Sequence, residues 1–268
     1  MSYKRMIRSI FAIFILGCFC VLTAFGQSQM TYQSTLRLLN EMRDVLINRD
    51  KLAKLFRVGD ERISDLVKAL DDPNPDISFR AQIVIRYLGN ENGMKGLFEW
   101  YSKQGKFRVA GPVPIPLRER DYKVICTQYI NEPPENWVRS ESYIYALALD
   151  SSPKAKEVLK KLIRIAGNLA EATVANRAIR QVQANQPAKI LIGKQDLAEL
   201  VLSNAFFVSS NDRKYASARL LTLNGARDKA LIEVHINRGA LSEEWYHVVI
   251  KKCGQNWCFL SITLIAMS

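Results

Sequence analysis

The sequence predicts an α+β fold, in which an N-terminal all-α part is followed by one helix and a four-stranded antiparallel sheet. Apolar residues recur at helical spacing between Tyr32 and Val182, and from Tyr215 onwards they alternate in twos. Turn sequences rich in glycine and asparagine separate the alternating stretches. We therefore expect three parts, which are an export segment over 1–26, an all-α domain over 27–187 and an α+β domain over 188–268.

The first 26 residues have the composition of an export signal. Three basic residues precede an uncharged apolar run from Ile10 to Phe25, which ends at the small-x-small sequence Ala24-Phe25-Gly26. Cleavage after Gly26 would give a periplasmic or secreted protein. Because the apolar run is close to the length that spans a bilayer, an uncleaved membrane anchor is the alternative. Ile15-Leu16-Gly17-Cys18 resembles a lipoprotein box, which would attach the chain to lipid instead.

The stretch from Glu61 to Trp100 predicts two helices joined at a proline corner and the start of a third helix. The first helix has apolar residues at i, i+3, i+4 and i+7, namely Ile63, Leu66, Val67 and Leu70. Pro73 and Pro75 end it, because each proline disfavours the α conformation in the preceding residue. The second helix runs from Ile77 to Leu88 and stops at Gly89. Two such helices cannot bury both of their faces, so neighbouring copies are expected.

This stretch resembles a HEAT repeat of the bacterial short type, the class also found in phycobilin lyases. The resemblance rests on the corner from Asp72 to Ile77, followed by Ala81, Ile85, Leu88-Gly89 and Leu97. Ser78 stands where the family commonly has an arginine. The resemblance implies a helical solenoid that binds other proteins, with no implied activity. Residues 145–166 repeat the same order of helix, corner and helix, which indicates a second, degenerate repeat.

Residues Gly111 to Pro116 contain three prolines, which predicts an extended segment between helices. Two interpretations are open. The segment is either a rigid connector on the helical surface or a recognition segment, because Val113, Ile115 and Leu117 alternate with the prolines.

Four strands and one helix are expected in the C-terminal domain. The helix covers 196–206, and the strands cover 215–223, 230–236, 245–250 and 257–265. The last two strands, which begin at Trp245 and Trp257, resemble the final hairpin of cone-shaped NTF2-like domains.

The parity of the strand residues separates two sheet faces. One face is assigned to the core under the helix and consists of Ile232, Val234, Ile236, Tyr246, Val248, Ile250, Leu260, Ile262 and Leu264. The other face carries the candidate ligand-binding residues, which are Arg219, Glu233, His235, Trp245, His247 and Trp257. These residues either line a pocket for a small ligand or a zinc ion, or form a polar sheet face that contacts solvent or the helical domain. The second interpretation is preferred, so no metal is assigned.

Cys253 and Cys258 flank the last turn, and in an exported chain this favours a disulfide. Register opposes it, because matching Ile250 with Leu260 leaves the two cysteines on opposite faces. A β-bulge near the turn would reconcile the apolar match with the disulfide. Cys126 has no catalytic partners nearby in the sequence and is interpreted as a buried structural cysteine.

Charge and motifs narrow the function classes. The formal net charge is +12, but the basic residues form short pairs without interleaved aromatics, which argues against nucleic-acid binding and leaves association with an anionic envelope surface. Phosphate loops, nucleophile elbows and metal-binding motifs are absent from the sequence, so no enzymatic activity and no cofactor are predicted. The leading hypothesis is an exported, non-catalytic, HEAT-like adaptor that binds a protein partner; the alternative is a C-terminal module that binds a small ligand or metal on its polar sheet face.

Overall fold

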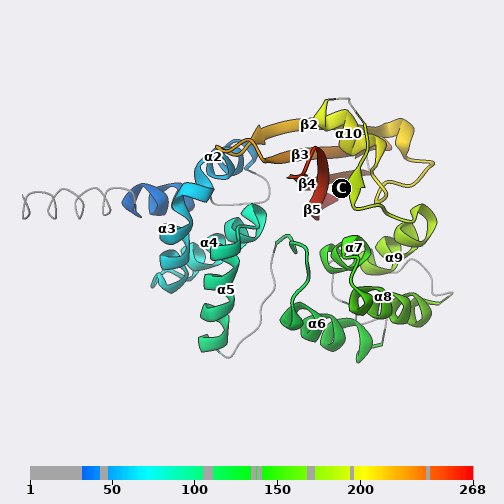
Figure 1. The fold of residues 1–268 in the computed structure, drawn as a ribbon, viewed down its shortest axis with the longest axis horizontal. Coiled ribbons are helices and arrows are strands. Elements are labelled where there is room, and N and C mark those ends of the chain that lie inside the picture. The colour runs from blue at the N-terminus through cyan, green and yellow to red at the C-terminus, as the bar shows by residue number, and fades with distance from the viewer. Residues whose placement is uncertain are drawn as a thin grey trace, which may run out of the picture.

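The fold is α+β and is built around one curled antiparallel sheet, as a computed structural model shows (Figure 1). The structure describes residues 32–42, 48–104, 111–133, 137, 141–167, 173–193, 196–239 and 242–267. The predicted export segment over 1–26 lies outside these residues. Within the described part of the chain, no helix is both long enough and apolar enough to cross a bilayer.

The sheet has five strands, so the expected number of four is wrong. The strands are β1 (Ile190–Leu191), β2 (Ala216–Leu223), β3 (Lys229–Asn237), β4 (Glu243–Cys253) and β5 (Asn256–Met267), in the order β1-β5-β4-β3-β2. Ile190 lies opposite Cys258, and Leu191 lies opposite Trp257. A strand of two residues is too short to show an alternation of apolar and polar residues, so the sequence does not predict it. β1 takes the strand conformation because it pairs with the edge of β5.

The N-terminal helices form the first of two helical groups. Residues 32–41 are helical, and α2 (Arg49–Val58), α3 (Ile63–Lys68), α4 (Pro75–Leu88) and α5 (Glu91–Gln104) follow. The helical hairpin of α3 and α4 lies where the apolar spacing places it. Pro75 occupies the first turn of α4, and the Asn74 side chain accepts a hydrogen bond from the Asp76 backbone N–H. This cap satisfies a donor that the helix start would otherwise leave unpaired.

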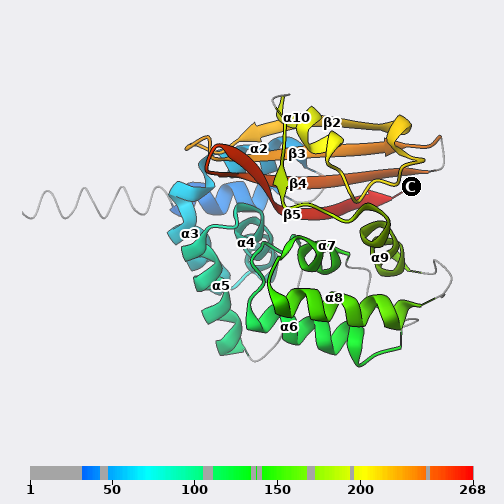
Figure 2. The same ribbon diagram turned by 45° about the vertical axis from the view of Figure 1, so that its right-hand side comes forward.

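The second helical group contains α6 (Glu119–Ile125), α7 (Ser142–Leu149), α8 (Pro153–Ala166) and α9 (Val174–Asn185), with α10 (Leu197–Ser203) over the sheet. A single π-helical turn, Cys126–Ile130, continues α6. Figure 2 shows α6, α7 and α8 together on one side of the sheet. Cys126, expected to be buried, is only partly buried and is the free cysteine among the described residues.

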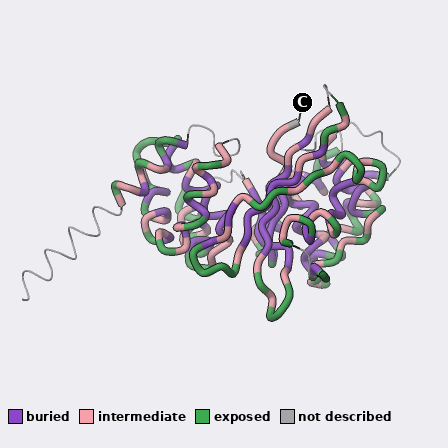
Figure 3. The backbone as a smooth tube through the Cα atoms, turned by 90° about the horizontal axis from the view of Figure 1, so that it is seen from above, coloured by how far each residue is buried: buried purple, intermediate pink, exposed green. Residues whose placement is uncertain are grey.

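The two helical groups pack on opposite faces of the sheet and form two separate cores. In Figure 3 the buried strands lie between the two groups of helices. The second group shares its core with Ile232, Val248 and neighbouring sheet residues, whereas the first group packs on Leu231, Val249 and Leu260. The helices therefore do not make one continuous stack, and the core of the second group crosses the domain boundary expected after residue 187. Both faces of the sheet carry apolar residues, so both need a cover.

A β-bulge in the last hairpin corrects two residues of the predicted faces. Val249 pairs with Ser261 but Ile250 pairs with Phe259, so Leu260 is the extra residue. The bulge reverses the parity of β5 towards the turn. Leu260 consequently lies in the core of the first helical group, and Trp257 packs against the core of the second, each opposite to the predicted face. The same reversal brings Cys253 and Cys258 onto one face, where they form a disulfide.

The proline-rich segment is a connector that covers the edge of the sheet. Val113, Ile115 and Leu117 are buried, and the Ile115 N–H donates to the Leu260 carbonyl at 3.1 Å. The Leu117 N–H donates to Asp150 Oδ2 at 2.7 Å. Since its apolar side chains and these backbone donors face inward, the segment holds the sheet rather than presenting a recognition sequence.

Arg86 of α4 is the largest polar side chain in the interior, with an exposed fraction of 1%. Burial opposes its charge, but Tyr143, Tyr101 and Asp121 outweigh that effect and raise the pKa of Arg86. These partners lie on α7, α5 and α6. Arg86 therefore couples the two helical groups electrostatically, beyond their separate packing on the sheet.

Gly89, which follows α4, is expected to tolerate substitution poorly, because it combines a left-handed backbone with a close contact. It ends α4 at φ 54°, and a Cβ there would lie 2.8 Å from Leu260 Cδ2. We expect Gly89→Ala to lower the free energy of unfolding by about 2 kcal/mol or more, from left-handed strain plus displacement of Leu260.

Gly254→Ala is the matched control for this prediction. Gly254 has φ +65° and nothing within 4 Å of the added Cβ, so only the backbone strain applies. Urea unfolding followed by circular dichroism measures both variants. Equal losses in the two variants would refute a role for the contact between Gly89 and Leu260.

Candidate functional site

The sheet register brings three of the six predicted ligand-binding residues together. Glu233 of β3 lies opposite Arg219 of β2 on one side and His247 of β4 on the other. Glu233 Oε1 is 3.3 Å from Arg219 Nη2, and Glu233 Oε2 is 3.9 Å from His247 Nε2. The parity of the sequence therefore predicts this grouping correctly, since cross-strand neighbours on one face lie within reach of each other.

Helices of the first group cover these residues. Arg49 of α2 reaches Glu233 Oε2 at 2.5 Å, and the Tyr87 hydroxyl of α4 lies 3.0 Å from His247 Nδ1. The side chains of His247 and Glu233 are 1% and 7% exposed. Arg49, Tyr87, Glu233 and His247 thus form a polar link between the first helical group and the sheet, which we call the interface network.

The protonation states in the interface network follow from burial and from the neighbouring charges. Burial lowers the pKa of His247, although Glu233 opposes this. Burial also opposes the charge of Glu233, but His247, Arg49 and Arg219 outweigh it and lower the pKa of that carboxyl. A neutral His247 with its Nε2–H directed at the Glu233 carboxylate accepts a hydrogen bond from Tyr87 at Nδ1. The interface network therefore joins the first helical group to the sheet through the contacts of Arg49 with Glu233 and of Tyr87 with His247.

The remaining predicted residues do not complete a pocket with these three. The rings of His235 and Trp245 stack on each other, with centroids 4.4 Å apart and planes inclined by 9°. The carboxylate near His235 belongs to Glu243, whose Oε2 lies 3.8 Å from His235 Nε2. Trp257 is on the opposite face because of the β-bulge. The candidate pocket of two histidines, a glutamate and two tryptophans is therefore not assembled.

Zinc coordination by this set has no geometric support either. Within the described parts of the chain, no group of three or more histidine, cysteine, aspartate or glutamate side chains is arranged to hold a metal ion. The two histidines of the chain serve different neighbours, one in the interface network and one in the stack with Trp245.

An arginine-lined pocket at the other end of the sheet is a second candidate site, which no pattern in the sequence predicts. The cavity measures about 560 Å³. Residues of α9, of the loop after α10 and of the end of β3 line it, namely Arg177, Arg180, Gln181, Ala184, Asn185, Ser209, Ser210, Asp212 and Arg238. We call it the arginine pocket.

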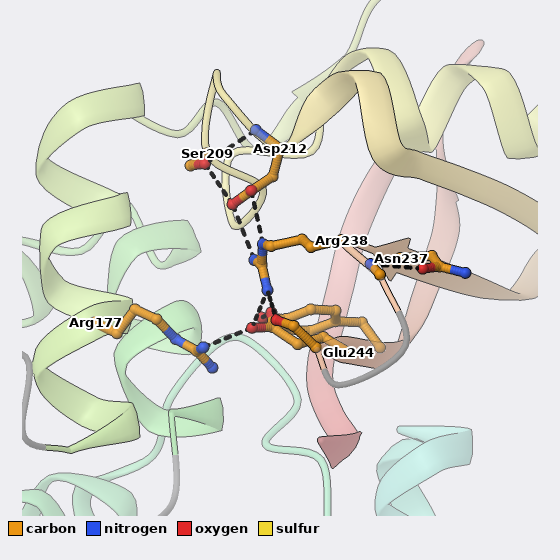
Figure 4. Close-up of polar contacts among 9 residues, drawn as sticks. Arg177, Ser209, Asp212, Asn237, Arg238 and Glu244 are labelled. Carbon is orange, nitrogen blue, oxygen red and sulfur yellow. Dashed lines mark hydrogen bonds and ion pairs between the residues drawn. The ribbon is translucent and has the colours of Figure 1, made fainter. Parts of the chain in front are cut away.

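A chain of ion pairs holds the wall of the arginine pocket in place. Arg238 binds Asp212 through two hydrogen bonds, Nε to Oδ1 at 2.7 Å and Nη2 to Oδ2 at 2.9 Å. Its third nitrogen, Nη1, lies 2.9 Å from Glu244 Oε1, and Arg177 Nη1 reaches the same oxygen at 2.5 Å. Figure 4 shows Arg238 between Asp212 and Glu244, with Arg177 approaching from α9. Paired guanidinium groups have few rotamers left, so the wall is preorganised.

Two buried carboxyl groups lie behind this wall. The side chain of Glu244 is 3% exposed, and its Oε2 accepts a hydrogen bond from the Tyr246 hydroxyl at 2.9 Å. Glu141, at the start of α7, accepts a hydrogen bond from the Leu264 N–H at 2.8 Å. Burial raises the pKa of Glu141 to about 7, with Glu244 adding to the effect and Arg177 opposing it. Arg177 of the pocket wall therefore interacts with a buried carboxyl group whose pKa lies near neutral pH.

The sequence offers little signal for the arginine pocket. Arg177 lies within a helix, Asp212 in a loop and Arg238 in a tight turn, and these residues follow no common motif. The one available signal is that Arg238 places a long charged side chain in the turn Asn237-Arg238-Gly239.

Comparisons with protein-family models, with curated proteins and with solved structures found no match to this chain.

Proposed function

We propose that this protein is an exported, non-catalytic adaptor that binds another protein, with α3, α4 and α5 acting as a HEAT-like unit. The capped proline corner between α3 and α4 supports the HEAT-like assignment. Export rests on the signal-like segment over 1–26 and on the composition of that segment. The interface network supports a scaffold role, because His247 and Glu233 of the sheet bond to Tyr87 and Arg49 of the helices and so hold the layers together.

The observation that carries the proposal is the difference between the two edges of the sheet. At the β5 edge the backbone donors of Phe259, Ile115 and Leu264 take part in hydrogen bonds that join β5 to Lys189, to the connector and to Glu141. β2 is the last strand on the other side. An edge strand presents a row of N–H and C=O groups, to which an extended segment of another chain can add.

The side chains along β2 favour an acidic partner segment. Tyr215 and Leu220 are exposed by 45% and 40%, so they add apolar surface next to the edge of the sheet. Arg213, Lys214 and Arg219 are exposed beside them. We therefore propose that the partner contributes an extended segment with apolar and acidic residues, which pairs along β2.

Photo-crosslinking tests this function and locates the surface. A photoreactive phenylalanine analogue is placed at Leu220, and in a separate variant at Phe79 of α4, which is similarly exposed at 44%. The full chain is produced in living cells with its own export segment, and the cells are irradiated. The crosslinked products are then identified by mass spectrometry. We expect a defined protein adduct from position 220, mapped to an acidic extended segment, and a weaker adduct after Lys214→Glu, a charge reversal at an exposed residue beside β2.

The matched positions make the outcomes distinct. A defined adduct from position 79 alone would place partner binding on the helical unit and refute the role of β2. Absence of a protein adduct from both positions would refute the adaptor function.

A further inference from the structure

We infer that the arginine pocket binds a small ligand that carries a phosphate or carboxylate group next to hydroxyl or amide groups. This inference is independent of the adaptor function, because the pocket residues lie on α9, the loop after α10 and the end of β3 rather than along the β2 edge.

The charge of the lining favours an anion. Three arginines and one aspartate line the cavity, which gives an excess of two positive charges. Asp212 is held by two hydrogen bonds from Arg238, and Arg238 lowers the pKa of Asp212, so the aspartate remains ionised and turned towards its partner. Glu244 lies behind the wall and offsets one further charge, and Glu141, whose pKa burial raises to about 7, offsets only part of the last one near neutral pH. A positive potential therefore remains at the opening, and guanidinium groups match the oxygen geometry of phosphate and carboxylate.

The uncharged residues of the lining favour a ligand whose remaining part, beside the anionic group, is polar. Ser210 supplies a hydroxyl group, and Ser209, Asn185 and Gln181 add polar atoms although each also bonds within the protein, whereas Ala184 is the one apolar residue of the lining. A cavity of about 560 Å³ lies within the size range of small-molecule sites in proteins. The size and polarity suit a sugar-sized ligand better than an extended apolar one.

The wall is also fixed before any ligand arrives. Asn185 Nδ2 donates to the Phe206 carbonyl at 2.8 Å, and Ser209 Oγ donates to Asp212 Oδ2 at 2.5 Å. The first bond joins α9 to the loop after α10, and the second fixes the loop itself, so the two sides of the pocket keep their separation. A rigid site loses less entropy on binding, which makes measurable affinity attainable for a small anion.

Isothermal titration calorimetry with the full chain tests the inference. The probes are a hexose phosphate, a hexuronate and the uncharged hexose, at an ionic strength near 0.15 M that screens weak surface attraction. We expect saturable binding of at least one charged probe and none of the uncharged hexose. The two charged probes distinguish a phosphate ligand from a carboxylate ligand.

Two variants and one control locate the binding. Arg180 is exposed and lines the pocket, and Arg180→Gln should weaken binding about tenfold or more, as expected for the loss of a charge-assisted hydrogen bond. Ser210→Trp should abolish binding by filling the cavity without changing its charge. Arg164→Gln makes the same charge change at an exposed position on α8 and should leave the affinity unaltered.

Thermal unfolding confirms that each variant is folded before the titrations are compared. Failure of both charged probes to bind the native chain would overturn the inference. Equal weakening by Arg180→Gln and Arg164→Gln would also overturn it, because that result means attraction to the general surface charge. Neither outcome bears on crosslinking at Leu220, so this inference and the adaptor function can fail separately.

Discussion

Replacing Glu244 by glutamine should lower the free energy of unfolding by about 3 kcal/mol. Glu244 is the shared acceptor for two arginines from different elements, Arg177 of α9 and Arg238 after β3. Both arginine side chains are about one quarter exposed, whereas Glu244 itself is almost fully buried. Removing the carboxylate charge leaves two guanidinium groups close together, only partly hydrated and without their shared anion. Such uncompensated buried charge is what makes the loss of one ion-pair partner destabilising.

The neighbouring residue supplies a matched control for this prediction. Glu243 is 27% exposed, and its Oε2 lies 3.8 Å from His235 Nε2, so Glu243→Gln should change the free energy of unfolding by less than about 0.5 kcal/mol. Urea unfolding monitored by circular dichroism measures both. The double variant Arg177→Met, Glu244→Gln should lose less free energy of unfolding than the sum of the losses in the two single variants, since both single variants remove the same interaction. Similar small effects of Glu243→Gln and Glu244→Gln would contradict the assigned role.

Replacing Glu141 by glutamine should make the protein more stable at alkaline pH and should alter how stability depends on pH. Burial raises the pKa of the Glu141 carboxyl from 4.5 to about 7. Between these two values the folded state holds a proton that the unfolded state has released. The free energy of unfolding therefore falls as the pH rises through this window, by about 3 kcal/mol in all, and stays low above it.

Glutamine preserves the packing at this position and removes the titration. Its side-chain oxygen can still accept the hydrogen bond from the Leu264 N–H. The difference in stability between Glu141→Gln and the native chain should be near zero at about pH 4 and reach about 3 kcal/mol in favour of the variant at about pH 8. His247 contributes an opposite slope at acid pH because its pKa is lowered, so the measured quantity must be this difference.

Urea unfolding across that pH range provides the measurement. Glu132→Gln is the control, because Glu132 is exposed and its replacement should not change the pH profile. A constant difference between Glu141→Gln and the native chain at all pH values would show that Glu141 does not titrate in this window.

The local elements follow from sequence patterns because they depend on neighbouring residues. The spacing from Ile63 to Leu70 and the proline corner predict α3 and α4, and α4 ends at the expected Gly89. Four strands lie where the alternation places them. β1 could not be predicted, since two residues carry no periodicity and their strand conformation depends on pairing with β5.

The candidate sites divide in the same way. The parity of β3 and β4 places Glu233 opposite His247, as predicted, because side chains alternate between the faces of a strand. The alternation places Trp257 on the wrong face, because the extra residue Leu260 reverses the parity of the residues between it and the turn. The arginine pocket depends on three segments meeting at one end of the sheet, and no local pattern encodes that meeting.

By itself, the sequence determined the class of fold, the helical hairpin with its caps and the faces of the central strands. These features arise from backbone preferences and from the periods of helices and strands, which act over a few residues. Only the tertiary structure decided that the polar sheet face would be covered by α2 and α4, which turns Glu233 and His247 from candidate ligands into contacts between layers. Only the tertiary structure also assembled the arginine pocket, because long-range packing sets which distant charged groups share one environment.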